Sequence, residues 1–336
     1  MSKLATVIGC TGMDGSTVAD QMVEKGIRVI GVSRRSSTDN KCRIRHLLNN
    51  PLFEYRECDV TDPVSVNNII KEKPDYVFHL AAQSHVGTSF SESSASFSIN
   101  TIGTINVLES IKLLSLNSRL YFAGSSEQFG SSIDEDGFQR ETTPFQPQSP
   151  YAISKVASYH LVRLYRETYG LHASCGILFN HEGPRRGSLF LTKKISEYCA
   201  DLYVNGYSKP LLLGNLSASR DWGYAPEYCN AMWLMLQQDK PDDYVIATSE
   251  THSVEQFCQE AFSVINKDYR DYVEVDQKFI RPAEVNYLKG CADKAKRVLG
   301  WEPKVKFKEL VKIMVESDVV QQLKNRINHD YSSKNC

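Results

Sequence analysis

The first half of the chain alternates short runs of β-branched and aromatic residues with longer stretches whose apolar residues recur at helical spacing. A strand that is followed each time by a helix returns parallel to the previous strand, so the pattern predicts an α/β fold with a doubly wound parallel sheet of six strand–helix units. The expected strands are Ala5–Ile8, Arg28–Val32, Phe53–Arg56, Tyr76–Leu80, Leu120–Ala123 and Ala173–Leu178. The expected helices are Thr17–Lys25, Val64–Lys71, Phe97–Leu114 and Tyr151–Tyr169. Ligands of such sheets collect beyond the carboxyl ends of the strands, so residues that follow strands are the candidate site residues.

The pattern becomes less regular after Leu178. A loop at Gly183–Gly187 precedes an expected helix near Leu191–Val204 and a short strand at Pro210–Leu213. Because 336 residues exceed the usual size of a single core, we expect these elements to form a smaller second lobe. The segment Asn325–Cys336 is expected to be loose.

Composition and charge narrow the classes of partner. The formal net charge of −1 provides no general field that would attract a polyanion, so nucleic acid is not an expected partner. No apolar run approaches the roughly 20 residues needed to cross a bilayer, and Met1–Ala5 leads into a strand-like run rather than a signal peptide, so we expect no membrane contact and a cytoplasmic location. The nine cysteines include no Cys-x-x-Cys pair, so neither a disulfide framework nor a metal site is expected.

Three glycines follow the first expected strand at intervals of three, in Gly9-Cys-Thr-Gly12-Met-Asp-Gly15. Glycine lets a diphosphate approach backbone amides at the start of a helix, where a side chain would block it. The same spacing arises by accident in loops, and only the strand–turn–helix context makes it a moderately specific signal. The turn residues expected to contact a dinucleotide are Gly9, Thr11, Gly12, Met13, Asp14 and Gly15.

The second expected strand ends in two arginines and serines. A site for NAD usually places an acid there, to bind the adenosine ribose. Here Arg34, Arg35 and Ser36 stand in its place, and guanidinium groups suit a 2′-phosphate through charge-assisted hydrogen bonds. The sequence therefore favours NADP as the cofactor. The alternative interpretation of the same residues is a basic turn exposed to solvent.

Two further strand ends carry candidate cofactor residues. Small residues after the fourth strand would allow close passage of the dinucleotide, and Asp59 after the third could reach the adenine. These candidates are Asp59, Val60, Leu80, Ala81, Ala82, Gln83 and Ser84. His85, next in the chain, is either a loop histidine or a substrate contact.

Tyr151 and Lys155 lie four residues apart, so they share one face of the last expected helix. There the ammonium could stabilise the deprotonated phenol, whose ordinary pKa is about 10, although such a pair also arises by chance. On an extended strand end, residues two apart point the same way, so Ser125 and Glu127 would face one ligand together unless Glu127 simply faces solvent. The candidate catalytic residues are therefore Ser125, Glu127, Tyr151 and Lys155.

Several longer segments resemble the extended short-chain dehydrogenase/reductase family, and within it most closely the GDP-mannose 4,6-dehydratase family. The resemblance runs from about residue 4 to about residue 320. The chain departs from the family pattern in carrying Ser125 in place of a threonine and in having short stretches at 43–59 and 264–280. The resembling segments, besides the glycine turn and the Tyr-x-x-x-Lys pair, are Arg34–Ser37, Ala82–Val86, Phe179–Gly187, Gly214–Leu216, Arg220–Gly223 and Arg281–Val285.

The resemblance implies a Rossmann domain that holds NADP and a smaller C-terminal nucleotide-sugar lobe interleaved in sequence, assembled as a homodimer or homotetramer. We expect the Rossmann domain at 1–178 and about 217–248, the lobe at about 179–216 and 249–325, and a loose tail at 326–336. By position, His181 and Arg186 would assist the cofactor. The expected substrate-binding residues are Ser84, His85, Ser125, Ser126, Glu127, Asn180, Lys194, Arg220, Arg281 and Glu284.

The implied reaction converts GDP-mannose to GDP-4-keto-6-deoxymannose and water. Tyr151 would take the C4 hydroxyl proton, polarised by Ser125, while hydride passes to NADP. Glu127 would then remove the C5 proton and protonate the departing C6 hydroxyl, after which hydride returns to C6 and C5 is reprotonated. Two alternatives remain open: an NADPH-dependent 4-keto reductase or epimerase of a nucleotide sugar, which uses the same Tyr, Lys and Ser, and a non-catalytic sensor of NADP.

Overall fold

The computed structural model describes residues 2–206, 209–279, 283 and 285–333. Its centre is a seven-stranded parallel sheet in the order β11-β6-β5-β4-β1-β2-β3. The strands are β1 (Leu4–Ile8), β2 (Arg28–Ser33), β3 (Phe53–Glu57), β4 (Tyr76–His79), β5 (Arg119–Ala123), β6 (His172–Leu178) and β11 (Asp243–Ile246). This confirms the predicted α/β fold, and β11 is a seventh strand that the sequence pattern did not reveal.

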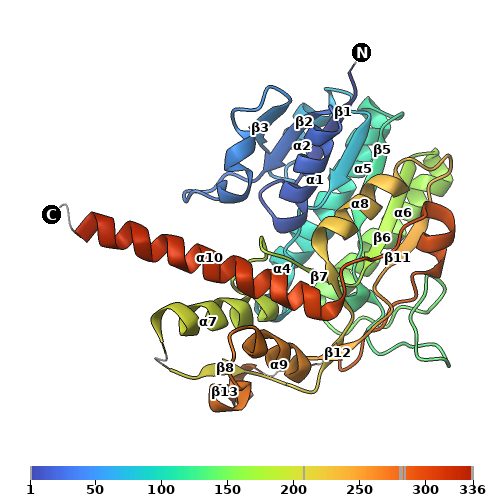
Figure 1. Cartoon of the computed structure of the whole chain (residues 1–336). Coiled ribbons are helices and arrows are strands. Elements are labelled where there is room, and N and C mark those ends of the chain that lie inside the picture. The colour runs from blue at the N-terminus through green and yellow to red at the C-terminus, as the bar shows by residue number, and fades with distance from the viewer. Residues whose placement is uncertain (1, 207–208, 280–282, 284, 334–336) are drawn as a thin grey trace.

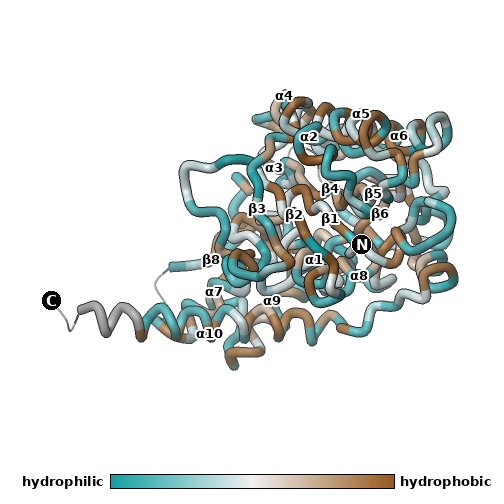
Figure 2. Tube along the Cα trace, turned by 90° about the horizontal axis from the view of Figure 1, so that it is seen from above, coloured by the Kyte–Doolittle hydropathy of each residue, from teal (hydrophilic) through white to brown (hydrophobic). Residues whose placement is uncertain are grey.

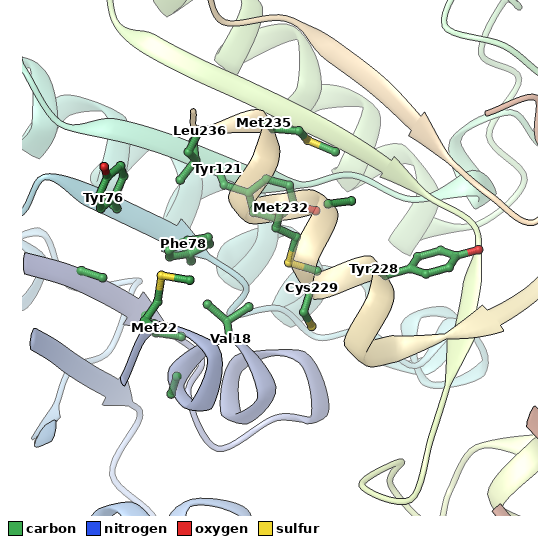
Figure 3. Packing of buried hydrophobic residues seen from close by; sticks show 14 of the residues in the cluster. Val18, Met22, Tyr76, Phe78, Tyr121, Tyr228, Cys229, Met232, Met235 and Leu236 are labelled. Carbon is green, nitrogen blue, oxygen red and sulfur yellow. The ribbon is translucent and has the colours of Figure 1, made fainter. Parts of the chain in front are cut away.

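Helices cover both faces of the sheet (Figures 1 and 2). One face carries α1 (Met13–Glu24) and α8 (Ala225–Met235), and the other carries α2 (Pro63–Ile70), α5 (Gly103–Leu114) and α6 (Pro150–Tyr169). Side chains of β1 alternate between two apolar clusters, with Val7 in the first and Ile8 in the second. Figure 3 shows the first cluster, where Met22 of α1 and Met232 of α8 meet Phe78 of β4. Both faces are therefore buried, as a doubly wound sheet requires.

The predicted helix Phe97–Leu114 is interrupted. The structure has α3 (Val86–Ser91), α4 (Ser93–Phe97), a π-helical turn η2 (Ser98–Ile102) and then α5. Within η2, the Asn100 side chain accepts a hydrogen bond from the Gln83 backbone N–H (2.8 Å) and donates one to the Gln83 carbonyl (3.1 Å). The widened π-helical turn therefore lies where the Asn100 side chain hydrogen-bonds to the Gln83 backbone and fixes the segment that follows β4.

The helix boundaries follow from capping residues. Helix α6 begins at Pro150, because Ser149 accepts a hydrogen bond from the Ala152 backbone N–H (3.1 Å). It ends at Tyr169 and is followed by Gly170, which adopts the left-handed conformation with φ of +69°. Asp62 caps α2 in the same way as Ser149 caps α6, by accepting from backbone amides of the first turn.

A second group of elements packs around its own apolar cluster. Its helices are α7 (Leu191–Asn205), α9 (Val254–Val264) and α10 (Phe307–Ser333), and its short strands pair as β7 (Asn180–Glu182) with β10 (Trp222–Tyr224), β9 (Ser219–Arg220) with β12 (His252–Ser253), and β8 (Leu211–Leu213) with β13 (Val273–Val275). The short 3-10 helices are η1 (Cys42–Leu47), η3 (Ser126–Gln128), η4 (Tyr269–Asp271) and η5 (Gln277–Phe279), and η6 (Ala295–Leu299) is a short π-helix. The proposed boundaries between the two domains stay a prediction.

Helix α10 extends further than the sequence pattern suggested. It continues to Ser333, inside the segment predicted as a loose tail, and Figure 1 shows it projecting past the end of α7. Its inner part is tied to α7 by a buried ion pair between Asp318 and Lys193. Lys193 also donates to the carbonyl of Pro184 (3.0 Å), so α10 indirectly supports the loop that precedes α7.

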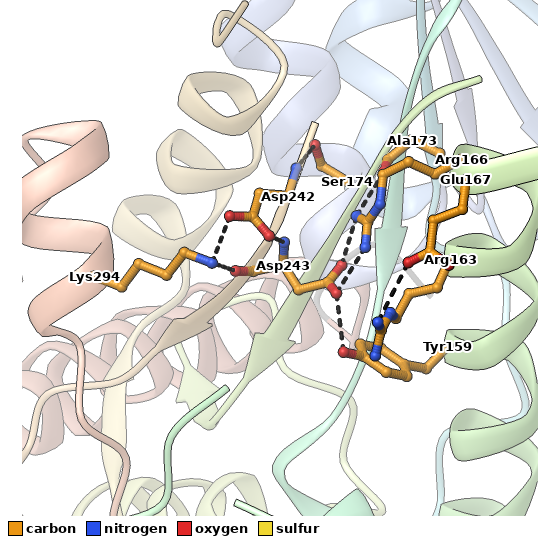
Figure 4. A network of polar contacts seen from close by, with 9 residues as sticks. All are labelled: Tyr159, Arg163, Arg166, Glu167, Ala173, Ser174, Asp242, Asp243 and Lys294. Carbon is orange, nitrogen blue, oxygen red and sulfur yellow. Dashed lines mark hydrogen bonds and ion pairs between the residues drawn. The ribbon is translucent and has the colours of Figure 1, made fainter. Parts of the chain in front are cut away.

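A polar network holds the edge strand β11 (Figure 4). The Asp243 carboxylate accepts hydrogen bonds from both terminal nitrogens of Arg166 and from the Tyr159 hydroxyl, all at 2.9 Å. Lys294 donates to the Asp243 carbonyl (2.7 Å) and pairs with Asp242 (2.6 Å). The buried carboxylate thus fixes β11 against α6 by bidentate pairing with a guanidinium.

Two further properties concern the whole described chain. All eight described cysteines are unpaired, and Cys42 is the exposed one among them. No helix in the described ranges combines the length and the apolar character needed to cross a membrane.

Candidate active site

A cavity of about 1170 Å³ opens at the carboxyl edge of the sheet. It is lined by the segments that follow β1, β2, β3, β4 and β5, by the start of α6, and by residues 178–194 and 212–222 that lead into or belong to the second group of elements. Every predicted site residue that the structure describes lines this cavity. Arg281 and Glu284 lie outside the described residues. The convergence of distant segments is confirmed, whereas the individual binding and catalytic roles stay predictions.

The glycine turn brings three backbone segments unusually close. Gly9 has a φ of +98°, and a Cβ on it would lie 2.8 Å from the Ala81 nitrogen. A Cβ on Gly15 would lie 2.1 Å from the Gly9 carbonyl oxygen, so neither position accepts a side chain. A Cβ on Gly12 would meet only the Gly9 oxygen, at 3.3 Å, and otherwise open space. The turn therefore presents bare backbone at the start of α1, which fits a phosphate-bearing ligand such as a dinucleotide.

Asp14 and His181 form an ion pair across the cavity wall. The His181 Nε2 lies 2.9 Å from an Asp14 carboxylate oxygen, and its Nδ1 lies 2.8 Å from the Phe179 carbonyl. Burial lowers the pKa of His181, but the charge and hydrogen bond of Asp14 outweigh it and raise that pKa overall. Burial likewise raises the pKa of Asp14, and His181 outweighs it, so the carboxyl pKa is lowered. The pair joins the first turn of α1 to β7.

The two arginines after β2 are exposed at one end of the cavity. Within the described ranges neither Arg34 nor Arg35 forms an ion pair. Both guanidinium groups and the hydroxyl of Ser36 border the same space as the glycine turn. This end of the cavity can therefore accept an anionic group.

Ser125 and Glu127 do not lie on an extended strand, so the argument that predicted their common orientation was wrong. Strand β5 ends at Ala123, Ser125 caps the single-turn helix η3, and Glu127 lies within η3. The Ser125 Oγ accepts a hydrogen bond from the Glu127 backbone N–H (3.3 Å), while Gln128 accepts one from the Ser125 N–H (2.7 Å). Both side chains nevertheless line the cavity, because the tight turn brings them together by a different route.

Tyr151 and Lys155 lie in the first turns of α6, and both are almost fully buried. The Lys155 ammonium donates to the Ala123 carbonyl (2.9 Å) and lies 6.0 Å from the centre of the Tyr151 ring. Burial raises the pKa of Tyr151 to about 12, against the opposing effect of a hydrogen bond with Ser125. Burial also lowers the pKa of Lys155 to about 8. The sequence predicted that Lys155 would lower the pKa of the Tyr151 phenol. Among the residues of the chain itself, that pKa is raised instead.

The other side of the cavity carries basic residues. Arg220 is 7% exposed and donates to the Ser219 carbonyl (3.0 Å), while the Lys194 ammonium lies 5.4 Å from the Phe279 ring centre. Asn180 begins β7 and lines the same cavity. Together they give this end of the cavity a positive character and one aromatic face.

Sequence comparison decides the family. The family described as GDP-mannose 4,6 dehydratase matches residues 6–314. A GDP-mannose 4,6 dehydratase of Arabidopsis thaliana is 48% identical over 328 residues, covering 94% of this chain and 87% of its own. The human GDP-mannose 4,6 dehydratase is 43% identical over 342 residues, covering 94% and 91%.

The chain belongs to the GDP-mannose 4,6-dehydratase family. The family resemblance noted in the sequence is confirmed, and with it the lyase class of the enzyme. A dTDP-glucose 4,6-dehydratase of Streptomyces venezuelae, solved with NAD, shares the fold with a TM-score of 0.83 and 23% identity, over 94% of this chain and 96% of that one.

The structure adds lining residues that the motif-based analysis of this dehydratase family member missed. The buried Glu182 carboxylate pairs with the Arg186 Nε (2.9 Å), and the Arg186 guanidinium lies 3.7 Å from the Phe190 ring centre. Glu182 ends β7 and Phe190 precedes α7, so their four-residue spacing from Arg186 does not follow one helix and was not a usable signal. Arg43 also lines the cavity, and no local pattern in the sequence pointed to it.

Asp14→Asn tests the ion pair. The variant should lower the pKa of His181, measured by NMR titration of its ring, because it removes the charge that favours the imidazolium. Since the folded-state pKa of His181 is raised, the pair stabilises the fold below the ordinary value of about 6.5 and loses this effect as pH rises through the folded pKa. The lowered Asp14 pKa keeps the effect down to about pH 4, below which it is lost as the carboxyl is protonated.

Between these limits we expect unfolding free energy to fall by roughly 2 kcal/mol in Asp14→Asn, with the difference shrinking above the folded pKa. Glu24→Gln, at the exposed end of the same helix, is the control and should change neither quantity. An unchanged His181 titration in Asp14→Asn would contradict the pairing.

Proposed function

We propose that this chain is an NADP-dependent dehydratase that converts GDP-mannose to GDP-4-keto-6-deoxymannose. One observation carries the proposal: the side chains of Ser125, Glu127, Tyr151 and Lys155 line a single cavity with the glycine turn. A hydroxyl, a carboxylate and a phenol around one sugar can serve both an oxidation at C4 and a loss of water from C5 and C6. Family membership supports the substrate.

The residues after β1 and β2 are suited to binding NADP. The bare glycine turn and the N-terminus of α1 would receive the diphosphate. Arg34, Arg35 and Ser36 would bind the 2′-phosphate, since no acid stands at the end of β2 to bind a ribose diol. When bound, the nicotinamide supplies acceptance and return of a hydride and, in its oxidised form, a positive charge that favours an ionised phenol.

Tyr151 moves the proton of the C4 hydroxyl. Because its pKa is raised to about 12 by burial, the phenol is protonated at neutral pH until a nearby positive charge assists its ionisation. The Ser125 hydroxyl, which hydrogen-bonds with Tyr151, would also contact the C4 oxygen. Lys155 is fixed by the Ala123 carbonyl and keeps further N–H donors for a ligand hydroxyl.

Glu127 carries the second half of the reaction. Oxidation of C4 to a ketone acidifies the C5 hydrogen, and the Glu127 carboxylate would remove it. The protonated carboxyl would then give its proton to the departing C6 hydroxyl, which leaves as water. The half-buried position of Glu127 at the cavity wall provides access to the sugar while limiting contact with solvent.

Glu127→Gln tests the dehydration step. The variant should still bind GDP-mannose and NADP, but product lacking one water should form about 10²- to 10⁴-fold more slowly, as measured by mass spectrometry. Glu135→Gln, on an exposed stretch outside the cavity, is the control and should react at the wild-type rate. A near wild-type rate for Glu127→Gln would remove the acid/base from the proposal, and net consumption of NADPH would favour a reductase.

Cofactor choice is tested by replacing the two arginines. Arg34→Ala with Arg35→Ala should raise the Kd for NADP by about 10- to 100-fold and leave the Kd for NAD nearly unchanged, because only NADP carries the 2′-phosphate. Arg28→Ala, exposed at the start of the same strand, is the matched control. A wild-type preference for NAD in the same titration would contradict the assignment.

The proposed assembly is a homo-oligomer through α5 and α6. Ile102, at the N-terminal end of α5, and Leu113 are 47% and 69% exposed, and Ile153 and Leu164 on α6 are 45% and 50% exposed. Each pair is eleven residues apart, about three turns, so each helix carries an exposed apolar stripe. A second copy would bury these stripes in a four-helix seam.

Leu113→Glu with Leu164→Glu should convert the oligomer to a monomer, as measured by light scattering after size exclusion. Val320→Glu, at an exposed site on α10, should leave the mass unchanged. A monomeric wild-type chain would contradict this assembly.

The cytoplasmic location stays a prediction.

A further inference from the structure

Arg43 crosses between two segments that border the dinucleotide end of the cavity. Its Nε donates to the carbonyl of Arg185 (2.7 Å), and one terminal nitrogen donates more weakly to the carbonyl of Thr11 (3.4 Å). Thr11 belongs to the glycine turn, and Arg185 belongs to the loop at 183–187 that leads into α7. The Arg43 guanidinium thus connects the glycine turn after β1 to the loop that contains Arg186.

The two ends of this connection are anchored separately. On one side, the neighbours of Arg43 in η1 hold it to the core, because Ile44 is fully buried and Leu47 is 4% exposed in the cluster beneath α1. On the other side, the Arg185 side chain pairs with Asp20 of α1 (2.6 Å). Asp20 also lies 2.7 Å from His46 of η1, so its carboxylate braces both segments.

The connecting segments enclose the space that the dinucleotide would use. Thr11, Arg43, Arg186 and Gly187 all line the cavity, and a Cβ on Gly187 would lie 4.0 Å from an Arg43 terminal nitrogen. We propose that Arg43 is a latch over this end of the cavity, whose contacts must break for NADP to enter or leave. The proposal rests on the proposed dinucleotide site and goes beyond it by assigning a residue that sets the rate of cofactor exchange.

The chemistry of the latch distinguishes it from a cofactor contact. Arg43 binds two backbone carbonyl oxygens of the protein, and these contacts can form whether or not a ligand is present. A contact of this kind raises the barrier in both directions. Its loss therefore accelerates association and dissociation together, whereas loss of a direct phosphate contact weakens affinity, chiefly through faster dissociation.

The test is stopped-flow fluorescence of NADPH binding to the full chain, with dissociation followed by displacement with excess NADP. Arg43→Ala should increase both rate constants by about 10- to 100-fold, the factor expected for one charge-assisted hydrogen bond, and change the Kd by less than roughly threefold. Arg45→Ala is the matched control on the same turn. Its side chain is 68% exposed and pairs with Asp39, so both rates should stay at the wild-type values.

Arg43→Lys covers the case in which the alanine variant does not fold. A lysine keeps the charge but lacks the planar fork that reaches two carbonyls, so both rates should lie between those of the wild type and those expected for alanine. Rates equal to the wild type in both variants, or faster dissociation with a proportional rise in Kd, would overturn the latch. If the wild-type chain binds no NADPH, the proposed function fails and the latch falls with it.

Discussion

The close approach of the chain at Gly9 and Gly15 is the constraint on which the site depends. With a Cβ 2.1 Å from a carbonyl oxygen, no other residue fits at Gly15 unless α1 moves away from the end of β1. That position of α1 in turn sets Val18 and Met22 into the core and Asp14 against His181. The close approach at this one turn therefore sets both the packing of α1 and the geometry of the cavity wall.

Much of the fold follows from local pattern. Parallel strands buried on both faces appear as short apolar runs, and their carboxyl ends must meet at one edge. Residues as distant as Gly9, Arg34 and Ser125 could therefore be placed in one cavity from the sequence. The family resemblance added the residues of the less regular second half, where periodicity alone gave little. Strand β11 escaped notice because its four residues lie far from the regular alternation and are held by tertiary bonds to Arg166.

The details that local pattern missed are those decided by tertiary contacts. The break at Asn100 depends on hydrogen bonds to Gln83, seventeen residues earlier in the chain. Glu127 reaches the cavity from a capped single turn rather than from an extended strand end, because Gln128 folds back onto the Ser125 amide. Burial, which no spacing reveals, also reverses the expected direction for the pKa of Tyr151 and makes its ionisation dependent on what lies beside it.

The free cysteines have a practical consequence. Burial raises the pKa of Cys10 and of Cys258 to about 12, so these thiols are poor nucleophiles near neutral pH. Cys42 is the exposed thiol among the described cysteines, and it adjoins Arg43 in η1. Once Cys336 is replaced, a maleimide dye should couple selectively at Cys42. Its emission would then report local motion of η1 in real time.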